Sequence, residues 1–526
     1  MQVRRLLVSN SRRFSFPPAI FLSLLTFYFS FRVNTLEVDS LNHTGHSVFR
    51  DYTDRSRVGS EATSLLNIAV LDTPLGDVTY HSHFCVAFRT SDENHWLKFT
   101  LEPSPTIVSN PGQVTHVQAD GTTRSIRAIK RSEISAFQGS VRVDGTGNGW
   151  NIVGWARVHF WKDGRDLLFE GTYSVQEVIH DIKVRVAGIG NTCQSDCTFG
   201  EPGQIYSYSA SGSYRPSRPS PPAQRSNTNA ERCKSQPLGT RRDNLEIDTT
   251  YRDVRRPSCI SQGEGECHEP IPSPQSISRC DFRSTIGDTV GCPSMNMIAS
   301  VGIATDCSYT ALFNSVGDVV RNVVGMINSA SEVFERSFNI TLRLSDLEVS
   351  EGTCPTPQQD AKDWNMPCSN GSLLDRLGNF SIWRATRADE NAFWTLITGC
   401  SGAGIGVAWV GQLCNTDYDQ SHGTGANVVV GMGQAWQIFA HEAGHTLGAV
   451  HDCEDDACQT DPNRSSACCA YSKTTCNAGG RYLMTPVFTQ QTNRFSPCSI
   501  GNVCGALGRG IVRSDCLVDS GGPGIP

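Results

Sequence analysis

The sequence predicts an α/β fold, with a mixed sheet and a helix that carries the candidate site, preceded by a β-rich domain. Between residues 83 and 173, short apolar runs alternate with polar residues in the period of two that is typical of half-buried strands. Between residues 297 and 446, strand-like runs are separated by stretches of helical apolar spacing. A chain of 526 residues is long enough for two or three domains, each with its own core.

Composition points to an oxidising compartment. The 21 cysteines imply several disulfides, whose pairing the sequence does not specify. The formal net charge of -7 is mildly acidic for a chain of this length. It gives no indication of the basic surface that binds nucleic acid. We therefore expect a secreted, extracellular protein that has no nucleic-acid partner.

Residues 1–35 are typical of a signal peptide, because arginines precede an apolar run at 19–31 that is short for a membrane span of about 20 residues. No small-x-small pair marks a cleavage site before residue 36, so an uncleaved anchor is the alternative. No later segment is long and apolar enough to cross a bilayer, and we expect no stable membrane span. In a secreted glycoprotein, the usable sequons would be Asn42, Asn339, Asn370, Asn379 and Asn463.

Residues 36–200 are predicted to form the β-rich domain. Its strand-like runs are residues 83–88, 96–101, 139–143, 153–160 and 167–173. The next stretch, residues 201–291, is predicted to be a linker, because it is rich in Ser and Pro and lacks apolar periodicity.

The linker carries two dibasic pairs, Arg241-Arg242 and Arg255-Arg256, where a processing protease could reach the backbone. Arg242 is the better candidate, because Pro257 directly after Arg256 would hinder cleavage there. Ordinary solvated arginines would give the same pattern.

Residues 292–526 are predicted to form the mixed domain. Its elements follow the order strand 297–304, helix 316–338, strand 340–349, helix 373–385 and strand 393–397. A glycine-rich run at 404–411 is predicted to be an edge strand, which can pair with an extended peptide through backbone hydrogen bonds. A plain glycine-rich turn is the alternative. Three late cysteines are expected to close disulfides, namely Cys498, Cys504 and Cys516.

One stretch of this domain predicts a metal site. On a helix, His441 and His445 lie one turn apart and share a face, and Glu442 lies beside them. Gly448 can take a left-handed conformation that ends the helix, so that His451 can approach the same ion. Three neutral imidazoles leave a fourth tetrahedral position open, which is the arrangement of a catalytic zinc site.

With Asp452 directly after the third histidine, the pattern resembles the zinc signature of the metzincin peptidases, and within them the reprolysin or ADAM branch. The resemblance implies a metzincin catalytic domain at 292–526 and a propeptide at 36–200. It also implies that Met484 lies beneath the metal, although a core methionine would fit equally, and that Asp452 anchors the turn below the site. The disintegrin module of larger family members is not expected in this sequence.

The resemblance further implies a metalloendopeptidase, a zinc-dependent hydrolase of extracellular proteins or peptides that is made as a zymogen. Zinc would activate water, and Glu442 would act first as general base and then as general acid. A processing protease at Arg242 or Arg256 would release the enzyme. The alternatives are a secreted zinc-binding protein-interaction module without proteolytic activity and a permanently latent protein.

Reprolysins hold the metal closed with a propeptide cysteine, and the odd number of cysteines here is consistent with such a thiol. None of the candidates stands in the Pro-x-x-Cys-Gly context of the family, and the sequence does not select among Cys193, Cys197, Cys233 and Cys280.

Overall fold

The computed structural model describes two domains. The N-terminal domain comprises residues 65–71, 78–90, 96–129, 135–145, 149–163, 166–186 and 205–206, and the C-terminal domain comprises residues 285–355, 364–400, 404–418, 423–431, 435–455, 468–486 and 493–521. All of them lie in one compact unit, Ser56–Pro526. The predicted signal peptide, the dibasic pairs and the four candidate switch cysteines fall outside the described residues.

The N-terminal domain is built on an antiparallel sheet. Its strands, in spatial order, are β10 (Ile205–Tyr206), β1 (Leu65–Leu71), β2 (Phe84–Thr90), β3 (Trp96–Pro103), β6 (Ser135–Gly145), β7 (Gly149–Asp163), β8 (Asp166–Val175) and β9 (Val178–Val186). Alternate side chains bury a core in which Phe84 contacts Phe137 and Phe160 edge to face, with ring centroids 5.1 and 5.0 Å apart. The predicted β-rich character of the N-terminal region is thereby confirmed.

The C-terminal domain contains a mixed sheet. Its spatial order is β14 (Gly406–Ala408), β15 (Ala426–Val430), β13 (Phe393–Thr398), β11 (Met297–Thr305), β12 (Ile340–Ser350), β4 (Val108–Val117) and β5 (Thr123–Ile129). The strands from β15 to β4 are parallel to their neighbours, whereas β14 and β5, at the two ends, are antiparallel. A two-residue strand, β16 (Val518–Asp519), pairs with one end of β11.

The helices of this domain are α2 (Cys307–Thr310), α3 (Val316–Phe338), α4 (Leu373–Ala385), α5 (Ala435–Thr446) and α6 (Pro497–Gly508). The predicted helices 316–338 and 373–385 are confirmed as α3 and α4, with the predicted bounds. A side-chain cap explains where α3 begins, and a left-handed residue explains where it ends. Ser315 accepts a hydrogen bond from the Asp318 amide at its start, and Asn339 takes a left-handed φ of 59° at its end. No helix among the described residues meets the length and apolarity that a membrane crossing needs.

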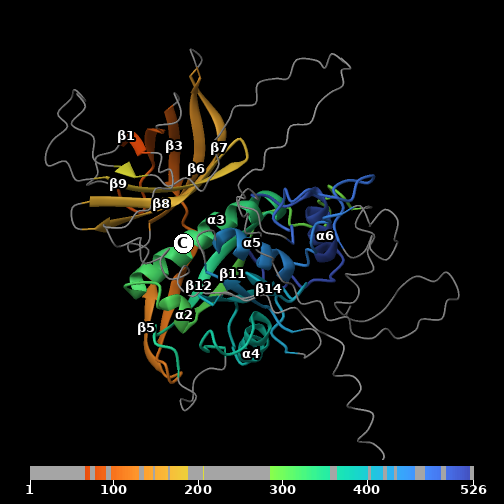
Figure 1. Cartoon of the computed structure of the whole chain (residues 1–526). Helices are drawn as coiled ribbons and strands as arrows, with labels where there is room; N and C mark the ends of the chain where they lie inside the picture. Colours follow the sequence, from red (N-terminus) through yellow and green to blue (C-terminus); the bar gives the residue numbers. More distant parts are fainter. Residues whose placement is uncertain are drawn as a thin grey trace, which may run out of the picture. The chain divides into compact units, whose positions relative to one another are not determined.

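Helices cover both faces of the mixed sheet (Figure 1), with α3 and α5 on one face and α4 on the other. Successive residues of the buried strands alternate between these two layers. Ile397 and Val429 pack in the core with α3 and α5, whereas Leu396 and Val428 pack with α4. The parallel strands are therefore buried on both sides, which explains their continuous apolar runs.

The β4–β5 hairpin belongs by sequence to the N-terminal domain, yet it extends the sheet of the C-terminal domain. Val114 pairs with Leu347 and Val117 with Ser350, in parallel register, and β5 becomes the outer strand. Nothing in the sequence predicted this sharing of one sheet by two domains.

Disulfides between described residues tie distant parts of the C-terminal domain together. The longest spans 212 residues and joins Cys292 to Cys504 on α6. The others are Cys307–Cys354, Cys368–Cys400, Cys414–Cys516, Cys453–Cys468 and Cys469–Cys498. The predicted disulfides of Cys498, Cys504 and Cys516 are thereby confirmed.

Candidate metal centre

Helix α5 carries the first two histidines. From Trp436 to Thr446 every residue of the helix is buried, because α5 packs against α3 and against β14 and β15 of the sheet. His441 and His445 are one turn apart on this buried helix, and their ring centroids are 4.7 Å apart.

A glycine turn brings in the third histidine. Gly448 has a φ of 101°, a left-handed conformation that a side chain would resist. Its amide donates to the His445 carbonyl at 2.8 Å, and the next amide, of Ala449, donates to Gly444 at 2.9 Å. The chain then reverses, so that the ring of His451 lies 4.8 Å from that of His445.

The three imidazoles present their Nε2 atoms to one point. Nε2 of His441 is 3.0 Å from Nε2 of His445 and 3.2 Å from Nε2 of His451. Tetrahedral zinc with Zn–N bonds of about 2.0–2.1 Å would separate its ligand nitrogens by about 3.3 Å. Among the described residues, only these three form a group of three or more histidine, cysteine or acidic side chains able to hold one metal ion.

Backbone carbonyls set the orientation of two rings. Nδ1 of His441 lies 2.5 Å from the Leu483 carbonyl, and Nδ1 of His445 lies 2.8 Å from the Ala449 carbonyl. A carbonyl can only accept, so each Nδ1 carries the proton and donates it, which leaves the Nε2 lone pairs directed at the metal position. Every residue has a backbone carbonyl, so no residue type in the sequence marks these two. Sequence reasoning missed both.

Burial keeps the three histidines neutral. It lowers the pKa of His445 to about 4, although the hydrogen bond to Ala449 raises it. Burial, and next the neighbouring imidazoles, bring the pKa of His441 well below its usual range, and burial followed by His445 does the same for His451. Neutral imidazoles with converging lone pairs repel one another unless a cation lies between them, so the donor set fits a metal ion such as zinc.

Glu442 lies against the edge strand. Its side chain is fully buried on α5, and a Cβ added at Gly406 on β14 would lie 2.2 Å from its Oε1 atom. The glycine therefore allows the edge strand to approach the carboxylate more closely than any other residue would. The predicted edge strand at 404–411 exists, but only Gly406–Ala408 pair, antiparallel to β15.

Met484 packs against the histidine helix α5. It is completely buried, and a Cβ added at Gly444 would be 2.9 Å from its sulfur atom. Because Gly444 has no side chain, the thioether of Met484 can pack against α5 between His441 and His445. The side chain belongs to the hydrophobic core, in keeping with the packing of methionine in irregular gaps.

Asp452 joins the third histidine to the following helix. Its amide donates to the Met484 carbonyl at 2.7 Å, and its Oδ1 accepts from Ser496 Oγ at 2.6 Å and Ser499 Oγ at 3.3 Å. Burial raises the pKa of Asp452 to about 7, although the two hydroxyls lower it. Sequence reasoning missed both serines, although Ser496-Pro497 is a helix-start signal.

Replacing Asp452 with Ala should lower the free energy of unfolding by about 1–3 kcal/mol, because it removes the buried acceptor of two hydroxyls. Urea unfolding of the metal-loaded protein would measure this change. Asp515→Ala is the matched control, since Asp515 pairs with Arg513 at an exposed surface and should contribute little. Equal effects of the two substitutions would contradict the anchoring role.

The mixed sheet, the buried helix with two histidines and a glutamate, and the third histidine after a glycine turn are features that metal-dependent peptidases share. Residues 295–496 match the family model described as metallo-peptidase family M12, of the reprolysin type. This part of the chain is thus similar to reprolysin-type metallopeptidase domains, and the predicted resemblance is confirmed.

Two fungal relatives cover most of the chain. It is 35% identical over 485 residues to the disintegrin and metalloproteinase domain-containing protein B of Aspergillus fumigatus, covering 87% of this chain and 60% of that protein. The protein of the same name from Arthroderma otae is 32% identical over 506 residues, with 91% and 63% covered. The zinc metalloprotease mde10 of Schizosaccharomyces pombe is 26% identical over 240 residues, with 41% and 46% covered. This chain thus spans less than two thirds of each of these relatives.

Proposed function

We propose that the chain is a secreted, zinc-dependent endopeptidase that is made as a zymogen and cleaves extracellular proteins or peptides. The observation that carries this proposal is the convergence of three Nε2 atoms beside a buried glutamate and a sheet edge. Zinc would be held by His441, His445 and His451, and when bound it would polarise the scissile carbonyl and acidify the attacking water.

The chain's own residues would position the substrate and move the proton. The edge of β14 can pair with an extended peptide through backbone hydrogen bonds, which places the scissile bond beside α5 whatever its side chains are. Glu442, held against β14 by burial, takes the proton of the attacking water and passes it to the leaving amine. Met484 and Asp452 keep the turn beneath the histidines in place.

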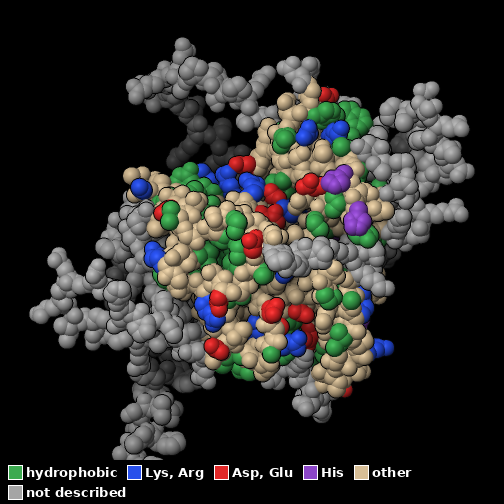
Figure 2. Space-filling model, turned by 180° about the vertical axis from the view of Figure 1, so that it is seen from behind, with side chains coloured by type: hydrophobic (Ala, Val, Ile, Leu, Met, Phe, Trp, Pro, Cys, Tyr) green, Lys and Arg blue, Asp and Glu red, His purple; other side chains and the backbone are tan. Residues whose placement is uncertain are grey.

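Charged side chains of both signs lie on the surface of the described residues (Figure 2). Figure 2 shows Lys and Arg side chains interspersed with Asp and Glu on one face of the described residues. The proposed substrate class is an extended, moderately apolar peptide, because pairing with the edge of β14 would use the substrate's backbone and not its charges. The zinc-binding interaction module remains the alternative, and the glutamate beside the histidines favours the enzyme.

Secretion and latency belong to the same proposal. Several disulfides among the described residues suit an oxidising compartment. Release by a processing protease at Arg242 or Arg256 and closure by a propeptide thiol concern residues outside the described ones. Of the sequons, Asn370 is exposed in a turn before α4, whereas the Asn339 amide donates to the Pro293 carbonyl at 3.2 Å. We therefore favour Asn370 as a glycan site.

Cleavage of casein by the purified secreted chain, cut in its linker, tests the function. We expect cleavage that is lost when a zinc chelator is added and returns when zinc is restored, because the histidines alone supply no electrophile. A chelator analogue that does not bind metal is the control. Inactivity of the cut, zinc-loaded chain would overturn the enzyme proposal and favour the interaction module.

A further inference from the structure

The two domains are joined by a continuous β-ladder. Five residues of β4, from Gln113 to Val117, pair in parallel register with Asp346 to Ser350 of β12. Further backbone bonds extend the ladder at both ends, from the Leu344 amide to the Ile107 carbonyl and from the Glu351 amide to the Val117 carbonyl, each 2.8 Å long. Separation of the domains would leave this side of β12 without partners.

The domains also share a hydrophobic core. Ile107, Val114 and Ile179 of the N-terminal domain belong to the cluster that contains α3 and α5, and at most 3% of each is exposed. These side chains are packed as in a domain interior, whereas separable domains usually meet through more polar surfaces. Separation would expose apolar area on both sides.

An ion-pair cluster with a buried arginine joins β7 to α3. Arg157 is 3% exposed, and its Nη2 atom lies 2.7 Å from Oε2 of Glu332 and 2.6 Å from Oε2 of Glu335. Burial lowers the pKa of the guanidinium, but the two glutamates raise it by more, so that it ends above its usual value. Asn328 on α3 also donates to the Phe137 carbonyl at 3.2 Å.

Two contacts of the N-terminal domain reach the surroundings of the metal centre. Trp155 meets Trp436, at the start of α5, edge to face with centroids 6.2 Å apart. Glu177, in the turn between β8 and β9, forms an ion pair with Arg494. The Arg494 carbonyl accepts from the Leu483 amide at 2.9 Å, and the Leu483 carbonyl in turn orients His441.

We infer that the N-terminal domain remains bound after the linker is cut, as a non-covalent subunit of the peptidase that supports its sheet and its active-site helix. The inference rests on the proposed processing of the linker. All the contacts described above lie outside residues 207–284, so a cut there removes none of them. The partner of this surface is thus a segment of the same chain, the residues of the N-terminal domain.

The test uses the full-length, zinc-loaded Glu442→Gln chain with a specific protease site inserted after Arg242. This variant cannot digest itself, so the result does not depend on whether the protein is a peptidase. We expect the two fragments to separate on a denaturing gel but to co-elute at the mass of the uncut chain in size-exclusion chromatography at micromolar concentration. Separate elution under these conditions would overturn the inference.

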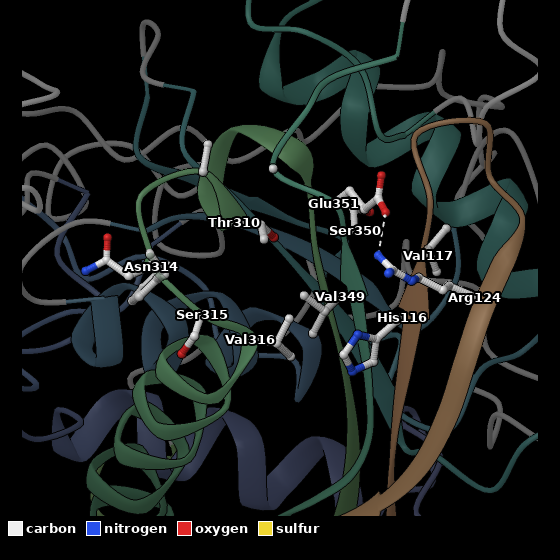
Figure 3. A pocket seen from close by; sticks show the side chains of 13 residues that line it. His116, Val117, Arg124, Thr310, Asn314, Ser315, Val316, Val349, Ser350 and Glu351 are labelled. Carbon is white, nitrogen blue, oxygen red and sulfur yellow. Dashed lines mark hydrogen bonds and ion pairs between the residues drawn. The ribbon is translucent and has the colours of Figure 1, made fainter. Parts of the chain in front are cut away.

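Two arginines of the same interface provide matched variants. Arg124 on β5 pairs with Glu351 after β12 at 3.4 Å, but its side chain is 68% exposed, beside a cavity of about 250 Å³ (Figure 3). In the cut chain, Arg157→Ala should raise the dissociation constant by about 30-fold or more, because it leaves two carboxylates unpaired at the interface. Arg124→Ala should change it by less than about fivefold.

Dilution of the cut variants, followed by mass photometry, measures these constants. If uncut Arg157→Ala does not fold, Glu332→Gln replaces it, since this change removes one charge and keeps the shape. Equal dissociation constants for the buried-pair variant and for Arg124→Ala would contradict the interface described here.

Discussion

Replacing Glu442 with Gln should lower kcat/KM for casein or peptide cleavage by about 10²–10⁴-fold while the metal content stays unchanged. Glutamine keeps the shape of the side chain but cannot take a proton from water at neutral pH. The metal should remain, because the ligands are the three histidines and their orientation depends on the carbonyls of Leu483 and Ala449. Initial rates and metal analysis of the same preparation would measure both quantities.

Glu390→Gln is the matched control for this change, because Glu390 is an exposed carboxylate in the loop after α4. It should keep full activity. An interaction module would bind its partner equally well with either substitution. If Glu442→Gln lost no measured activity, whether cleavage or partner binding, this result would therefore favour the module. Loss of metal in Glu442→Gln would instead assign the glutamate a structural part in the centre.

Replacing Gly406 with Ala should lower kcat/KM by about 10²-fold, again with the metal retained. The added Cβ would lie 2.2 Å from Oε1, 2.7 Å from Cδ and 2.9 Å from Cγ of Glu442. Because α5 is buried, the added methyl group has no free space around it. Either the carboxylate of Glu442 or the edge strand β14 must therefore shift. Either shift would misplace the general base relative to a peptide paired with β14.

Gly378→Ala on α4 is the control for this second substitution, since nothing lies within 4 Å of its added Cβ. It should leave activity unchanged and stabilise the helix slightly. Steady-state kinetics of the two variants, with their metal contents, would separate the effects. Unchanged activity of Gly406→Ala would show that the carboxylate is not held against β14 during catalysis.

Local chemistry explains what could be predicted from the sequence. The bounds of α3 follow from its cap residue Ser315, its apolar spacing and the left-handed residue Asn339 that ends it. Similarly, Gly448 carries the positive φ that the turn toward His451 needs. The histidines that converge lie within eleven residues, so helix geometry and one turn suffice to bring them together.

Contacts between residues far apart in the chain could not be predicted. Val114 pairs with Leu347, which lies more than two hundred residues further along the chain. The alternation of apolar and polar side chains in β4 would fit an edge strand of either sheet. The Leu483 carbonyl that orients His441 is a backbone atom, which every residue has. The approach of Gly406 to Glu442 likewise depends on how β14 lies over α5, and the glycine-rich run alone indicated only that some close approach occurs.

The position of β5 at the outside of the shared sheet has a consequence for solubility. Most side chains of β5 are exposed, Arg124 among them, and charged side chains on an outer strand discourage a second sheet from adding to it. Strand β12, which is largely buried, has no such protection on the side that β4 covers. A C-terminal domain produced without the β4–β5 hairpin would therefore expose the unpaired backbone edge of β12. We expect it to aggregate by pairing of these edges between molecules.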